Sequence, residues 1–195
     1  MDRLMVFVDG TNLLRQLSKY LDIDYSAMKP TPTMIWLASD LANRRIKHLD
    51  GKTQTIRRHW FASFQGRDDD KLNYMELLRK YSLEPHLYKN KEGRQEKGVD
   101  IGLATEILVN AFHQNYEYCY LIAGDTDYLG LIKEVKRYGA IVYGGFFSKG
   151  LSTDLRLEFD AFHLLEDETE KFNALIEKYR PIIFDEVNAS KKANK

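Results

Sequence analysis

Short runs of consecutive apolar residues recur along the chain and predict strands that are buried on both faces. The clearest runs are "LMVFV" (4–8), "YCYLIA" (118–123) and "AIVYGGFF" (140–147). A strand covered on both sides has a continuous apolar run, whereas in a strand with one solvated face apolar and polar residues alternate. Weaker strand candidates are "TIRRHWFASF" (55–64) and "LEPHLY" (83–88). We expect 152–165 to be irregular, with one short strand near 162–165.

Apolar residues at helical spacing fill the stretches between these runs. We expect helices directly after 4–8 and within 31–49, 68–82, 99–112, 127–138 and 167–180. In 99–112, for example, apolar residues recur every three or four positions, at Ile101, Ala104, Leu108 and Phe112. Strands that alternate with helices predict an α/β fold of three layers, in which helices flank both faces of a mostly parallel central sheet.

Composition and charge indicate a single globular domain and exclude several function classes. A chain of 195 residues fits the usual size of roughly 100–200 residues for one domain. Lysine plus arginine and aspartate plus glutamate both number 29, so the chain is not a general polycation that coats nucleic acid. No apolar run approaches the roughly 18 residues of a membrane span, and we expect no membrane partner. The N-terminus does not read as a signal peptide, and the single cysteine, Cys119, excludes an internal disulfide, so we expect a cytoplasmic protein.

Acidic residues stand at the carboxyl ends of two predicted strands. Asp9 follows "LMVFV", and Asp125 and Asp127 follow "YCYLIA". In parallel α/β sheets, ligands bind outside the carboxyl ends of the strands, where the strand order reverses. If these two strands are neighbours, the three acids meet at one edge. Carboxylates crowded in this way must share protons, pair with cationic side chains or bind a cation, and Mg²⁺ and Mn²⁺ prefer such oxygen ligands.

Each acid also has a purely structural interpretation. Asp9 could belong to a turn before a helix capped by Thr11 or Asn12, and Asp125 could be an N-cap with Asp127 as a favourable first-turn charge. The sequence has no P-loop, no GxSxG elbow and no Cys/His spacing for zinc, and its five scattered histidines are expected to be structural or surface residues. Phosphoester hydrolysis assisted by a divalent ion is the reaction that the acids favour.

Three sequence blocks resemble the NYN domain family, in its LabA-like group within the PIN-like metal-dependent ribonucleases. They are "VFVDGTNLL" (6–14), "KGVDIGLATEIL" (97–108) and "LIAGDTDYLGLIKEVKRYG" (121–139), and 142–165 resembles the closing segment of the family. The resemblance runs from about residue 3 to about residue 165. Ala123 stands where the family usually has serine, and Tyr128 where it usually has phenylalanine. Neither change removes a carboxylate.

The resemblance implies a PIN-like, Rossmann-like fold and a ribonuclease that depends on Mg²⁺ or Mn²⁺. Four catalytic aspartates would surround one or two ions: Asp9, Asp100, Asp125 and Asp127. A metal-activated water would hydrolyse RNA phosphodiester bonds by in-line attack and leave 5′-phosphate and 3′-hydroxyl ends. Substrate contacts would come from Asn12, Lys97, Arg44, Arg45, Arg57 and Arg58. Aromatic residues near them, Trp60, Phe61 and Tyr88, are expected in the core more than on a base-stacking surface.

The chain is expected to have three parts: an NYN domain at 1–165, a C-terminal helix at 166–185 that packs on it, and a disordered tail at 186–195. Homo-oligomerisation through that helix is left open. Two other functions remain at this point. One is a catalytically weak NYN domain that binds RNA or a protein partner for regulation. The other is a haloacid-dehalogenase-like phosphatase, a family that needs a second acid two residues after the first, where this chain has Thr11.

Overall fold

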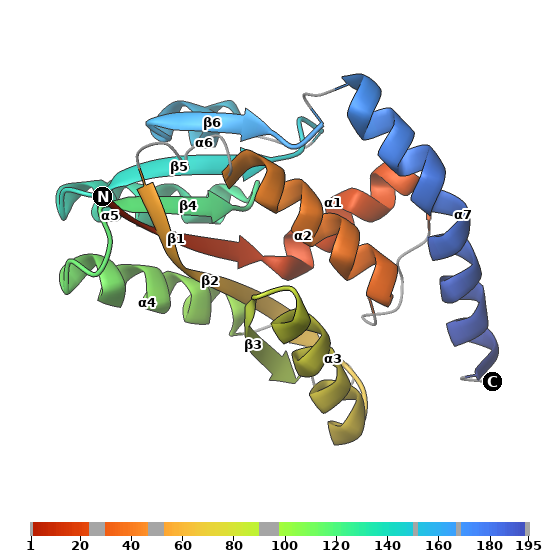
Figure 1. Cartoon of the computed structure of the whole chain (residues 1–195). Coiled ribbons are helices and arrows are strands. Elements are labelled where there is room, and N and C mark those ends of the chain that lie inside the picture. The colour runs from red at the N-terminus through yellow and green to blue at the C-terminus, as the bar shows by residue number, and fades with distance from the viewer. Residues whose placement is uncertain are drawn as a thin grey trace.

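The computed structural model describes residues 2–23, 30–46, 53–89, 98–149, 152–166 and 169–193, with side chains except at 42–46, 169 and 191–193. The first half of the chain forms β1 (Asp2–Asp9), α1 (Gly10–Leu21), α2 (Pro32–Ile46), β2 (Thr53–Phe64), α3 (Asp68–Lys80), β3 (Glu84–Lys89) and α4 (Val99–Phe112). The second half forms β4 (Tyr118–Ile122), the 3₁₀ turn η1 (Thr126–Tyr128), α5 (Leu129–Arg137), β5 (Ile141–Phe146), α6 (Thr153–Glu158), β6 (Ala161–Leu164) and α7 (Thr169–Ala193) (Figure 1).

The six strands form one sheet in the order β3-β2-β1-β4-β5-β6, and every neighbouring pair is parallel. The prediction of a mostly parallel sheet is therefore confirmed. From β1 the chain winds outward to β2 and β3, and then returns to the other side of β1 to begin β4. The order reverses between β1 and β4, which makes the carboxyl ends of these two strands the expected ligand-binding edge.

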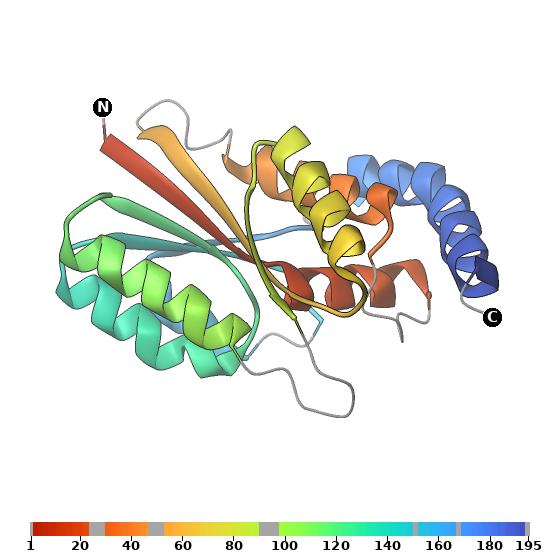
Figure 2. The same ribbon diagram turned by 90° about the horizontal axis from the view of Figure 1, so that it is seen from below.

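Two apolar cores lie on opposite faces of the sheet. Alternate side chains of β1 separate them: Leu4, Val6 and Val8 face the core under α1, α2, α3 and α7, while Met5 and Phe7 face the core under α4, α5 and α6. Figure 2 shows α4 and α5 together on one side of the sheet, with α1, α2, α3 and α7 on the other. Helices thus flank both faces, which confirms the predicted three-layer architecture.

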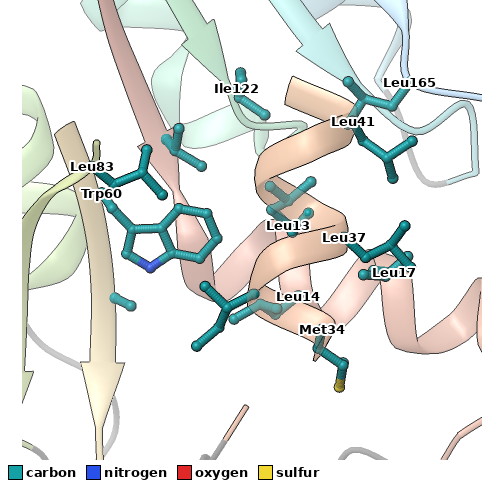
Figure 3. Packing of buried hydrophobic residues seen from close by; sticks show 14 of the residues in the cluster. Leu13, Leu14, Leu17, Met34, Leu37, Leu41, Trp60, Leu83, Ile122 and Leu165 are labelled. Carbon is teal, nitrogen blue, oxygen red and sulfur yellow. The ribbon is translucent and has the colours of Figure 1, made fainter. Parts of the chain in front are cut away.

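The larger core is built around the indole of Trp60. Leucines of α1 and Met34 and Leu37 of α2 lie in the same cluster as this ring (Figure 3). Trp60 and Phe61 are both buried, as expected of core residues. The indole Nε1 of Trp60 donates a hydrogen bond to the hydroxyl of Tyr74 at 3.2 Å, so its one polar group is satisfied inside the core.

The structure differs from the sequence-based expectation in two segments. The stretch expected to be irregular contains α6, a short helix held by the buried side chain of Leu155. Helix α7 continues through Pro181 to Ala193, past residue 185, where a disordered tail was expected to begin. Contacts beyond the proline explain the extension, because Ile183 is buried and Glu186 accepts a hydrogen bond from the Thr33 hydroxyl at 2.7 Å.

No helix in the described ranges combines the length and the apolar character that crossing a bilayer requires.

Candidate active site

Asp9, the last residue of β1, is buried at the point where the strand becomes α1. One carboxylate oxygen accepts a hydrogen bond from the backbone N–H of Asn12 at 2.9 Å, so Asp9 itself caps the helix, in place of Thr11 or Asn12. Gly10 allows this tight junction, because a Cβ there would lie 2.2 Å from the Trp60 indole. The cap fixes one oxygen of Asp9, and the other oxygen accepts a hydrogen bond from the Tyr128 hydroxyl.

The hydroxyl of Tyr128 connects Asp9 to Asp100. It lies 2.9 Å from Oδ2 of Asp9 and 3.1 Å from Oδ1 of Asp100. These groups come from β1, from the first turn of α4 and from η1, three segments that are far apart in the sequence. A hydroxyl has one proton to donate, so it cannot satisfy two ionised carboxylates at once. The Tyr128 hydroxyl can therefore donate to only one of these two carboxylates at a time.

The pKa of the Asp9 carboxyl is raised to about 6, chiefly because burial disfavours the charged form. Hydrogen bonds from Asn12 and Tyr128 oppose this shift, whereas the charges of Asp100 and Asp125 add to it. Burial and the two neighbouring carboxylates raise the pKa of the Tyr128 hydroxyl as well, so it stays protonated. Asp100 and Asp125 thus both lie close enough to act electrostatically on Asp9.

Asp125 and Asp127 lie on the turn after β4. The Asp125 side chain caps η1 by accepting a hydrogen bond from the backbone N–H of Asp127 at 3.1 Å. Asp125 therefore does act as an N-cap, the structural role that the sequence also allowed. Asn12 connects this turn to α1, because its side-chain oxygen accepts a hydrogen bond from Gly124 N at 3.4 Å. Asp127 is exposed, and it is the backbone N–H of Asp127, not its carboxylate, that meets Asp125. We call Asp9, Asp100, Asp125 and Asp127 the aspartate cluster.

The aspartate cluster fits a hard divalent cation by chemistry, but it is open. Its donors are carboxylate, amide and hydroxyl oxygens, the ligands that Mg²⁺ and Mn²⁺ prefer. Its oxygens are nevertheless too widely spaced to form a closed shell. Among the described residues, the group of three whose ligand atoms all lie within 4.8 Å of one another is His59, Glu84 and His86, on β2 and β3.

The basic residues expected to bind RNA lie outside the aspartate cluster or outside the described side chains. In the sheet register Arg57 and Arg58 align with Met5 and Val6, whereas Phe61 aligns with Asp9. At about 3.3 Å per residue they lie roughly 10–13 Å upstream of the carboxyl edge. Arg57 instead pairs with Glu84 at 3.1 Å. The side chains of residues 44 and 45, and all of residue 97, fall outside the described residues.

Two groups at the edge escaped the sequence analysis. One is the Tyr128 hydroxyl. The sequence did contain a signal for it, because the family usually has phenylalanine at this position and this chain has tyrosine. The other is Lys149, which lines a small pocket together with Asn12 and Gly124. Lys149 follows the end of β5, so the strand-end rule that selected the aspartates could also have selected it.

Comparisons with known proteins agree with this fold. The NYN domain family model matches residues 3–166. The crystal structure of VPA0982, a protein of unknown function from Vibrio parahaemolyticus, matches with a TM-score of 0.60 and 16% identity, covering 86% of this chain and 94% of its own. At that identity the likeness concerns the fold alone. A comparison with curated proteins finds no match. Because the family model covers most of the sequence, the chain belongs to the NYN domain family.

Proposed function

We propose that this NYN domain is a metal-dependent ribonuclease of the PIN-like, LabA-like type. The observation that carries the proposal is the pairing of Asp9 and Asp100 on the Tyr128 hydroxyl, with Asp125 acting on Asp9, at the edge where the strand order reverses. NYN domains are usually nucleases, and this edge is where an α/β sheet of this order binds its ligands. The repulsion that Asp100 and Asp125 exert on Asp9 is the second support, because a divalent cation would relieve it.

Each residue of the site has a proposed role. Asp9, held by Asn12 N and Tyr128, would be the fixed ligand, and Asp100, Asp125 and Asp127 would complete the coordination. A bound Mg²⁺ or Mn²⁺ ion supplies water activation and charge neutralisation at the phosphate. Tyr128 would position Asp9 and Asp100 through its hydroxyl. The amide of Asn12 would orient the scissile phosphate beside them.

RNA would approach along the carboxyl edge of the sheet, beside the aspartate cluster. Asn12 and Lys149 line a pocket there that has room for no more than a water molecule, so a backbone phosphate would bind at its mouth, against the amide and the cationic side chain. Contacts with phosphate dominate nucleic-acid affinity and weaken with added salt. Arg44, Arg45, Arg57, Arg58 and Lys97 remain proposed contacts for more distant phosphates. Of these, Arg57 and Arg58 would contact RNA only if it extends along β2.

The phosphatase alternative is disfavoured by the surroundings of Thr11. Its hydroxyl is buried and accepts a hydrogen bond from Ser63 N at 2.9 Å. The position where that family needs an acid is therefore a packing contact between α1 and β2.

Metal-dependent cleavage of single-stranded RNA tests the proposed function. We expect the wild-type protein to cleave with Mn²⁺ or Mg²⁺, to stop cleaving when the ion is chelated, and to leave 5′-phosphate ends. Asp9→Asn and Asp125→Asn should lower the cleavage rate at least a hundredfold, since each removes charge where the phosphate reacts. Asp69→Asn, at an exposed aspartate of α3, is the matched control and should retain full activity.

RNA binding, measured separately by fluorescence anisotropy, distinguishes the enzyme from a binding module. The two site variants should still bind RNA, whereas Lys149→Gln should bind more weakly and with a shallower salt dependence. Equal behaviour of the wild type and both aspartate variants in cleavage would refute the nuclease. Binding without any metal-dependent cleavage would establish the regulatory module in its place.

A further inference from the structure

Two histidines and a glutamate meet on β2 and β3, beneath α4. His59 and Glu84 are register partners on the two parallel strands, and His86 lies two residues after Glu84. Side chains two residues apart on a strand point to the same face. We call His59, Glu84 and His86 the histidine cluster. Within the cluster, His59 lies on β2, the strand next to the one that ends at Asp9. It stands two residues before Phe61, which aligns with Asp9 in the register of β1 and β2.

The spacing of the ligand atoms fits a small tetrahedral ion. Nδ1 of His59 lies 3.0 Å from Nε2 of His86 and 3.7 Å from Oε2 of Glu84. Two ligands at the usual zinc–nitrogen distance, about 2.0–2.1 Å in a tetrahedron, lie roughly 3.3 Å apart. The two nitrogens therefore need to separate by only a few tenths of an ångström, and the glutamate oxygen to approach by a similar amount.

Aromatic neighbours hold both imidazole rings in place. His59 stacks on Phe7 of β1, with 5.1 Å between ring centroids and 8° between planes. His86 stacks on Phe61 of β2, at 4.3 Å and 7°. The rings are therefore oriented before any ion binds, which reduces the ordering cost of coordination.

The ligand atom that His59 would offer is Nδ1. This nitrogen faces His86 and Glu84, whereas Nε2, on the other side of the buried ring, has no hydrogen-bond partner in the described structure and would keep none with the ion bound. Burial lowers the pKa of both His59 and His86, so both rings are neutral near pH 7. A neutral imidazole offers a lone pair, which is the form that binds metal.

The surrounding charges suit a divalent ion. Glu84 lies within the histidine cluster, and Glu106 of α4 acts electrostatically on both rings. Among the described residues, His59 and His86 offer two nitrogens and Glu84 an oxygen, while Glu106 adds negative charge nearby and Arg57 adds positive charge. Oε2 of Glu84, the oxygen that faces His59, also accepts a hydrogen bond from Arg57 at 3.1 Å, so on ion binding this oxygen would be shared with Arg57, or the carboxylate would turn and offer Oε1.

We propose that His59, Glu84 and His86 form a second metal site, selective for Zn²⁺ and separate from the aspartate cluster. Imidazole ligands suit zinc, whereas clusters of oxygen ligands suit magnesium and manganese. Glu106 or a water molecule would occupy the fourth position. The ion would tie the edge strand β3 to β2, and β3 also carries Tyr88, which packs against Gly98, just before α4, and Gly102 within it. The site is structural and would stabilise the side of the sheet that supports Asp100.

Titration with Co²⁺, a coloured substitute for Zn²⁺, tests this site directly. The full-length protein, purified without a histidine tag and stripped with a chelator, should bind one equivalent of Co²⁺ with the intense visible absorption of a four-coordinate ion. Zn²⁺ should displace it and raise the melting temperature. His86→Gln, a change at a half-buried residue, should lower the affinity for Co²⁺ and Zn²⁺ at least tenfold and abolish the thermal shift.

Two controls separate the histidine cluster from other histidines and from the proposed nuclease site. His113→Gln, at an exposed histidine after α4, should bind like the wild type. The double variant Asp9→Asn/Asp125→Asn should lose Mn²⁺ binding but keep the Co²⁺ absorption, so each site can fail independently of the other. Absence of Co²⁺ binding, or Co²⁺ absorption unchanged in His86→Gln, would overturn the proposal and leave a hydrogen-bonded imidazole pair.

Discussion

At the scale of single residues, the proposed function depends on the environment of one carboxyl group. Asp9 is buried, caps α1 and shares the Tyr128 hydroxyl with Asp100. Burial and two nearby acids raise its pKa to about 6, and the Tyr128 hydrogen bond partly offsets the rise. The same carboxylate would have to be ionised to bind a divalent cation. Its titration therefore links metal binding, folding stability and pH.

Tyr128→Phe should shift the pH dependence of Mn²⁺ binding upward. The variant removes a hydrogen bond that stabilises the ionised form of Asp9, so the pKa of Asp9 rises further. We expect the acid limb of Mn²⁺ affinity to move by about one pH unit, measured by calorimetric titration between pH 5 and pH 8. Tyr138→Phe, at an exposed tyrosine, is the control and should match the wild type. A curve that does not move in Tyr128→Phe would disprove the coupling.

Asp9→Asn should stabilise the metal-free protein at neutral and alkaline pH. The folded-state pKa of about 6 lies above the ordinary aspartate value of 3.8, so the stability that this group contributes is complete below pH 4 and is lost as pH rises through 6. The loss approaches roughly 3 kcal/mol above pH 7. An asparagine does not titrate and avoids this loss.

Urea unfolding with chelator present measures this effect. At pH 8 the free energy of unfolding of Asp9→Asn should exceed that of the wild type, and the difference between the two should vanish near pH 4. Saturating Mn²⁺ should reverse the order by stabilising the wild type alone. If Asp9→Asn were less stable than the wild type at pH 8 without metal, burial of the charged Asp9 carboxylate would not be destabilising the fold. Asp69→Asn again serves as the exposed control.

At the scale of elements, α4 reaches the site because its N-terminus lies close to β3. Gly98 precedes the helix with φ at 122°, a conformation that favours glycine. Gly102, one turn later, faces the Tyr88 ring, and a Cβ there would lie 1.7 Å from the Tyr88 hydroxyl oxygen. The two glycines thus let Tyr88 pack on the turn that carries Asp100.

Gly102→Ala should destabilise the wild type but stabilise a chain that lacks the Tyr88 ring. Alanine favours the helix by about 1 kcal/mol over glycine, but in the wild type its methyl group would force Tyr88 out of its place. In a Tyr88→Ala background the clash is absent, and only the helix preference remains. Denaturant unfolding of the four proteins of this double-mutant cycle gives the coupling. Additive effects would mean that Tyr88 does not restrict α4.

Several elements could be predicted from the sequence because their patterns are local. The runs at 4–8, 118–123 and 140–147 became β1, β4 and β5, and Gly139 follows α5 with φ at 87°, as expected for a helix-ending glycine. Helix α6 and the end of α7 could not be predicted, because contacts distant in sequence decide them. In α7 the burial of Ile183 and the bond between Glu186 and Thr33 extend the helix beyond Pro181.

At the scale of the whole molecule, strand order determines which residues meet. The sequence placed Asp9 and the Asp125–Asp127 pair after two strands, but only the order β3-β2-β1-β4-β5-β6 makes those strands neighbours. Asp100 entered the expected site through family resemblance alone, because a helix start carries no signal of which strand end it faces. The histidine cluster had no signal at all, since His59 and His86 are 27 residues apart and come together only through the pairing of β2 with β3.

A crystal grown with Mn²⁺ as the only divalent ion tests the central claim most directly, by anomalous density. The claim is that Asp9, Asp100 and Asp125, with Asp127 beside them, hold a divalent cation at the carboxyl edge of the sheet. We predict an anomalous peak among these carboxylates, within about 2.2 Å of their nearest oxygens. An aspartate cluster without a peak at saturating Mn²⁺ would contradict the account.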